Sequence, residues 1–97
     1  MAIFFMFGTY TKESAKEISA ERTKKAVTVI ERLGGKIKSM YSLLGEHDLI
    51  FIVDLPDVQN AMKVSVALHQ LTGINFTTSP VVNVEEFDKL IGELKEM

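Results

Sequence analysis

Ala2-Ile3-Phe4-Phe5-Met6-Phe7 is an unbroken run of apolar residues that ends at Gly8. Side chains of a strand alternate between its two faces, so this run would cover both faces of a sheet with apolar groups. It is too short to cross a bilayer as a helix, and helical patterns follow it. We therefore predict a central strand buried on both faces, with Phe4 and Met6 in the core or at a contact between chains.

The composition is that of one globular domain spanning residues 1–97, with 46% hydrophobic and 25% charged residues. The formal net charge is −2, and the basic residues are interleaved with acidic ones. No basic stripe is available for a phosphate backbone, so nucleic acid is not an expected partner. The absence of cysteine excludes disulfides and thiolate chemistry and fits a reducing compartment. Because the amino terminus lacks the pattern of a secretory signal, we expect a cytoplasmic protein without a membrane segment.

Helical spacing of apolar residues predicts two main helices. The first covers about residues 20–33 and ends at Gly34-Gly35, with a buried stripe of Thr23, Val27, Ile30 and Leu33. The second opens at Pro56-Asp57 and closes at Gly73, with a buried stripe of Val58, Ala61, Val64, Leu68 and Leu71.

Capping patterns predict two further helical segments. Ser14 and Glu17 have capping-box spacing, which indicates that a short turn of helix begins at Ser14. Asn83 and Glu86 have the same spacing before a terminal helix. Its single apolar face is formed by Val84, Phe87, Leu90, Ile91 and Leu94.

Residues 36–44 and 48–54 read as a hairpin around a turn at Gly45-Glu46. If Leu44 pairs with His47, one face carries Ile37, Ser39, Tyr41, Leu43, Asp48, Ile50 and Ile52. The opposite face then carries Lys38, Met40, Ser42, Leu44, His47, Leu49, Phe51 and Val53. A last strand over about residues 75–82 contains Pro80, which cannot donate to a ladder and therefore belongs at a sheet edge.

This order of elements predicts an α+β, ferredoxin-like βαββαβ fold with a C-terminal helix and a four-stranded antiparallel sheet of order 4-1-3-2. Both main helices cover one face, although the first and third strands are apolar on both sides. Another copy of the sheet is the simplest cover for the second face, so we expect a homodimer and allow a dimer of dimers. Phe51, like Phe4 and Met6, is assigned to the dimer face or the core.

Four segments resemble the GYD-domain family: Gly8-Thr9-Tyr10-Thr11, Leu33-Gly34-Gly35-Lys36, Tyr41-x-x-Leu44-Gly45-Glu46-His47-Asp48, and Pro56-Asp57. These are small prokaryotic proteins of uncharacterised function. The resemblance implies the dimeric α/β-barrel fold, shared with small monooxygenases, muconolactone isomerase-like enzymes and amino-acid-sensing domains of transcription regulators. His47 replaces the tyrosine of the motif that names the family, while Gly45 and Asp48 match it.

Tyr41, His47 and Asp48 are the predicted polar residues of a small-molecule site, placed between sheet and helices or near the hairpin. The competing interpretation is a solvated turn in which Asp48 accepts hydrogen bonds from turn amides. Residues 46–48 point alternately and His69 has no partner at a suitable spacing, so no metal site is expected. We take the first and third strands as parallel, which puts Tyr10 at the opposite end of the sheet from the hairpin turn, about 20 Å away.

The chain contains no serine-histidine-acid pattern, phosphate loop or dinucleotide fingerprint, so we expect no cofactor. Its third strand is aliphatic and acidic, unlike the aromatic RNA-binding strand of modules with the same topology. Two classes of function remain. One is a module that binds a small apolar or amino-acid-like ligand or a protein partner. The other is a cofactor-free enzyme of the monooxygenase or isomerase type, supported by fold analogy alone.

Overall fold

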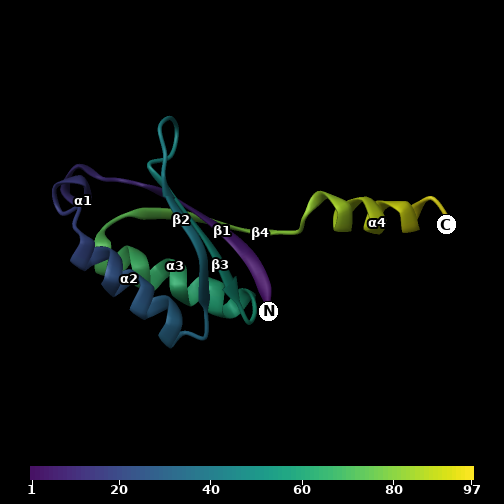
Figure 1. The fold of residues 1–97 in the computed structure, drawn as a ribbon, viewed down its shortest axis with the longest axis horizontal. Helices are drawn as coiled ribbons and strands as arrows, with labels where there is room; N and C mark the ends of the chain where they lie inside the picture. The colour runs from purple at the N-terminus through teal and green to yellow at the C-terminus, as the bar shows by residue number, and fades with distance from the viewer.

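The computed structural model describes residues 1–97 and contains one four-stranded antiparallel sheet with α2 and α3 packed on one face (Figure 1). The strand order is β2-β3-β1-β4, which confirms the predicted order 4-1-3-2 read from the other edge. No helix is long and apolar enough to span a membrane. In chain order the elements are β1 (Ala2–Thr9), α1 (Lys12–Lys16), α2 (Ala20–Arg32), β2 (Lys36–Ser42), β3 (Leu49–Leu55), α3 (Val58–Thr72), β4 (Asn75–Val81) and α4 (Val84–Leu94).

β1 lies in the middle of the sheet and pairs antiparallel with both β3 and β4. The expectation that the first and third strands run parallel is therefore wrong. In an antiparallel sheet every adjacent pair must run in opposite directions, so the end of β1 lies beside the start of β3. Tyr10 and the hairpin turn are consequently at the same end of the sheet.

The two faces of β1 have different surroundings. Phe4 and Met6 point under the helices and are 2% and 0% exposed, and Phe51 of β3 joins them in the same core cluster. Ile3, Phe5 and Phe7 alternate with them and lie half-buried on the face that no helix covers. We call this the helix-free face.

The hairpin keeps the predicted register over Ser39–Ser42, where Tyr41 lies opposite Ile50. A bulge between Ile37 and Ser39 then shifts the pairing by one residue, so that Ile37 lies opposite Val53 and packs against the core. Ile37 was expected on the face of Tyr41, and this placement is wrong. One inserted residue moves all later side chains of a strand to the opposite face of the sheet. No local sequence signal marks the insertion.

The main helices begin at capping residues. The side chains of Ser19, Asp57 and Asn83 accept hydrogen bonds from the backbone amides three residues on, at the starts of α2, α3 and α4. The N-cap of the short α1 is Thr11, three residues before the expected Ser14, and Ser14 completes the capping box from inside the helix. Gly73 closes α3 with φ of 73°, a conformation that favours glycine.

The buried stripes of the helices agree in part with the predicted ones, since Ile30 in α2 and Ala61, Val64 and Leu68 in α3 are buried as expected. In α2 the buried residues are Ala26 and Ile30, with Thr23 exposed. In α3 they are Ala61, Val64, Leu68 and Thr72. Val58 and Leu71, which were predicted to be buried, are exposed because each lies at the border of the face that contacts the sheet.

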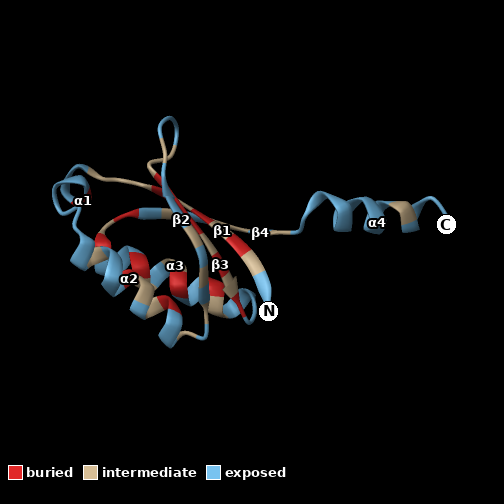
Figure 2. Cartoon of the chain, viewed as in Figure 1, coloured by how far each residue is buried: buried red, intermediate tan, exposed pale blue.

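α4 projects from the end of β4 and contacts no other layer (Figure 1), and it contains no buried residue (Figure 2). The rest of the chain forms two layers, with the buried residues between the helices and the sheet (Figure 2).

At Gly35 the backbone lies so close to core side chains that a Cβ atom would not fit. A Cβ there would lie 2.5 Å from Leu55 Cδ2 and 2.8 Å from Ile30 Cγ2. We expect Gly35→Ala to lower the free energy of unfolding by roughly 1–3 kcal/mol through overpacking, measured by urea denaturation. Gly92→Ala is the control, because a Cβ at that position meets nothing within 4 Å. Equal stability of the two variants would contradict this account.

Candidate functional site

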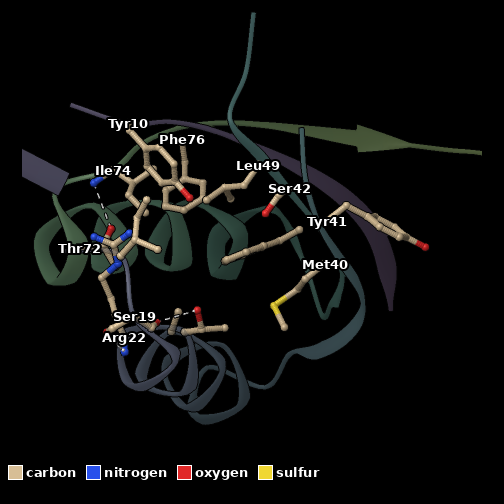
Figure 3. Close-up of a pocket in the computed structure, with 14 residues that line it drawn as sticks. Tyr10, Ser19, Arg22, Met40, Tyr41, Ser42, Leu49, Thr72, Ile74 and Phe76 are labelled. Atoms are coloured by element: carbon tan, nitrogen blue, oxygen red, sulfur yellow. Dashed lines mark hydrogen bonds between the residues drawn. The ribbon is translucent and has the colours of Figure 1, made fainter. Parts of the chain in front are cut away.

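A cavity of about 200 Å³ lies between the start of α2 and the β2–β3 side of the sheet (Figure 3). Its walls come from segments that are distant in sequence: the end of β1, the first turns of α2, both hairpin strands and the α3–β4 connection. The lining residues are Tyr10, Ile18, Ser19, Arg22, Thr23, Ala26, Met40, Tyr41, Ser42, Leu49, Phe51, Thr72, Ile74 and Phe76.

The cavity exists because the first half of α2 does not reach the sheet. Between the N-cap and Ala26 no α2 side chain is buried, and Ala26 itself is small. In the second half of α2, Ile30 is buried and packs against the other core residues. On the sheet side, Met40 points toward the space that results (Figure 3).

Tyr10 is positioned by the hairpin across from it. Its backbone amide donates to Asp48 Oδ2 at 2.7 Å, and the Asp48 amide donates to Gly8 O at 2.8 Å. Asp48 O also accepts from the amide of Leu43 at 2.8 Å. Asp48 therefore joins the end of β1 to both arms of the hairpin and holds the Tyr10 ring over the cavity.

Arg22 brings the only charged side chain to the cavity lining. Its guanidinium carbon lies 5.8 Å from the centroid of the Tyr10 ring, and its Nη1 donates to Ser14 O at 2.6 Å. One hydrogen bond uses one of five N–H donors, so the group retains donors for a ligand. Arg22 has this position because the first turns of α2 stand away from the sheet.

The three predicted site residues lie in different environments. Asp48 supports Tyr10 from outside the cavity lining. Tyr41 borders the cavity, but its ring points away from it (Figure 3) and is exposed on the helix-free face, in register with Ile50 and Phe7.

His47 also lies on the helix-free face. Its ring is 4.8 Å from that of Phe7, and its Nδ1 is within hydrogen-bond distance of Thr9 Oγ1 at 3.2 Å. The predicted register placed His47 with Phe51 on the other face, which is wrong. Beyond the Leu43–Asp48 hydrogen bond the hairpin has no further backbone pairing, so the strand alternation does not extend to His47.

The cavity lining is mostly apolar. Nine of the fourteen lining residues are hydrophobic, and the lining contains no aspartate, glutamate, histidine, lysine or cysteine. The Thr72 hydroxyl is already engaged. It donates to Leu68 O at 2.7 Å, and it accepts from the Ile74 amide at 3.1 Å (Figure 3). An apolar space with one cation and few hydroxyls fits a small apolar molecule with one anionic end.

Comparison with known proteins gives a family and a fold. The family described as the GYD domain matches residues 4–91. A crystal structure of the leucine response regulatory protein of Mycobacterium tuberculosis matches with a TM-score of 0.56 at 13% identity, covering 86% of this chain and 51% of that one.

Two further solved structures, both of point mutants, match with TM-scores of 0.56 and 0.57 at 13% and 12% identity. They cover 86% and 87% of this chain and 51% and 52% of theirs, so the chain spans about half the length of the structures it matches. No curated protein matches the sequence. At these identities the likeness shows the fold alone.

Asp48→Ala should remove the hydrogen bond that holds the Tyr10 amide at the end of β1. A hydrogen bond to a charged acceptor contributes about 1.5–3 kcal/mol, so we expect a loss of that order in the free energy of unfolding and faster hydrogen exchange at the Tyr10 amide. Asp48→Asn keeps an acceptor oxygen and should lose less. Unchanged exchange at Tyr10 in Asp48→Ala would show that this contact does not hold the residue.

Proposed function

The chain belongs to the GYD domain family, and from that premise we propose that it is a homodimeric domain that binds a small apolar carboxylate in the cavity beside Arg22. The observation that carries the proposal is the lining: mostly apolar, with a single guanidinium and no acidic side chain. A carboxylate would accept charge-assisted hydrogen bonds from Arg22, and the hydrocarbon part would contact Met40, Leu49 and Phe76.

The absence of an acidic lining residue separates two ligand classes. The regulatory protein of the same fold is described by its response to leucine, which carries an ammonium group next to its carboxylate. In this cavity an ammonium group would lose water without gaining a carboxylate partner, which costs free energy. An apolar acid without the amino group therefore fits better than the amino acid.

A cofactor-free enzyme is the alternative, and the lining gives it less support. Such chemistry needs a group that takes up or delivers a proton within reach of the substrate. Tyr10 is the only lining residue placed to offer one beside Arg22, because Tyr41 points away and His47 and Asp48 lie outside the lining. Binding without turnover is the function that this set of side chains favours.

The proposed dimer uses the helix-free face. Ile3, Phe5, Phe7 and Ile52 form a half-exposed apolar surface there, flanked by Tyr41. Two such sheets can pack face to face about 10 Å apart. We assign Tyr41 and His47 to this contact rather than to the ligand cavity.

Ligand binding is tested with 4-methylpentanoate, leucine and 4-methylpentanamide, using calorimetry and a search for reaction products. We expect the acid to bind most tightly and to be recovered unchanged. Arg22→Gln should weaken binding of the acid about 10- to 100-fold, as expected for loss of a charged hydrogen bond, and leave the weak binding of the amide unchanged.

Arg32→Gln, on the exposed end of the same helix, is the matched control and should bind as the wild type does. Leucine binding tighter than the acid, or equal loss of acid and amide in Arg22→Gln, would overturn the carboxylate assignment. A product formed from the acid would establish the enzyme alternative.

The dimer is tested with neighbouring residues of β1 that point to opposite faces. Phe5→Asp places a charge on the helix-free face and should halve the sedimenting mass of a protein that stays folded. Phe4→Asp places the same charge in the core, where the residue is 2% exposed, and should unfold the chain. A wild-type protein that sediments as a monomer at micromolar concentration would contradict the dimer.

A further inference from the structure

α4 is an amphipathic helix whose apolar side is uncovered. Phe87 and Leu90 are 52% and 48% exposed, and no residue of the helix is buried. Apolar side chains in this spacing mark the side of a helix that packs against another element. The chain supplies no such element, because α4 extends away from the two layers (Figure 1). The stripe consists of Val84, Phe87, Leu90, Ile91 and Leu94.

A second uncovered apolar surface lies on the outer side of α3, beside β4. Val58, Met62 and Val66 recur at intervals of four residues and are all exposed, with Met62 at 65%. They face a groove of about 390 Å³ whose opposite wall is formed by Phe76, Thr78 and Pro80 of β4. α3 thus has two apolar sides, and only the one that contains Val64 and Leu68 is explained by packing on the sheet.

We propose that this α3–β4 groove binds α4 of a second copy of the chain. The first reason is the direction of α4. Only Val82 and Asn83 separate it from β4, Asn83 is extended (φ −71°, ψ 161°), and its side chain accepts from the Glu86 amide at 2.8 Å. This cap directs the helix away from its own groove.

The charges of the two helices are complementary. α3 contains Lys63 and His69 and no acidic residue. α4 contains Glu85, Glu86, Asp88 and Glu93 against the single cation Lys89. An acidic helix whose apolar side enters the groove would bring carboxylates beside Lys63, which is exposed next to Met62. Opposite charges at the rim favour this pairing over the association of two α4 helices with each other.

The exchange can be reciprocal. If two copies are related by a two-fold axis, each inserts its α4 into the groove of the other and the buried area doubles. The surfaces involved are separate from the helix-free face, and they share only Phe76 with the cavity beside Arg22. The contact uses neither Arg22 nor the helix-free face, so it is tested separately from the proposed function. The two two-fold contacts together generate a dimer of dimers where their axes cross.

The absence of natural cysteine allows a direct test by disulfide trapping. Full-length Met62→Cys and Leu90→Cys proteins are mixed, oxidised and analysed by mass spectrometry. We expect the mixed disulfide between the two variants as the main covalent product, because a disulfide requires Cα atoms within about 7 Å. Lys25→Cys, exposed on α2 away from the groove, replaces Met62→Cys as the control and should give little product.

Three results would overturn the proposal. One is equal trapping of Leu90→Cys by Met62→Cys and by Lys25→Cys. Another is preferential trapping by Ile52→Cys, which would put α4 on the helix-free face. The third is a Met62→Cys/Leu90→Cys double variant that closes its disulfide within a monomer. As a second measurement, Phe87→Glu should reduce the sedimenting mass at unchanged circular dichroism, whereas Glu93→Gln, which leaves the apolar stripe intact, should not.

Discussion

β1 forms hydrogen-bonded ladders with both β3 and β4, and its side chains are apolar on both faces. β1 thus needs a hydrogen-bonded strand at each edge and an apolar cover on each face, and these needs determine the positions of the other elements. Helices α2 and α3 cover Phe4 and Met6 on one face, and the antiparallel pairing brings the end of β1 to the hairpin. The contact between Tyr10 and Asp48, and with it one end of the cavity, follows from the direction in which β1 runs.

The sequence predicts most of the fold because its strongest local signals agree with one another. Asp57 and Asn83 are the N-caps that the sequence indicates, Gly73 ends its helix, and Pro80 lies on an edge strand. The bulge beside Ile37 has no such signal, because its cause is the fit of β2 against β3 rather than the preference of any one residue.

The candidate site is predicted less well, because it depends on how elements lie against one another. The cavity lies at the hairpin end of the sheet, where the sequence analysis placed a site, and Asp48 accepts a hydrogen bond from the Tyr10 amide beside it. Tyr10 is misplaced by the assumption of parallel strands, although the predicted strand order already requires the antiparallel arrangement. Arg22 has no marker in the sequence, since its role depends on the gap that the small Ala26 leaves beneath α2.

The walls of the cavity extend from Tyr10 to Phe76, so they include parts of nearly every element of the two layers. We expect contacts between residues so far apart in sequence to form only after the loops between them have closed. A molecule bound in this cavity would therefore stabilise the native state and not the transition state for folding. It would prolong the lifetime of the folded protein by slowing unfolding, while the rate at which new chains fold would stay the same.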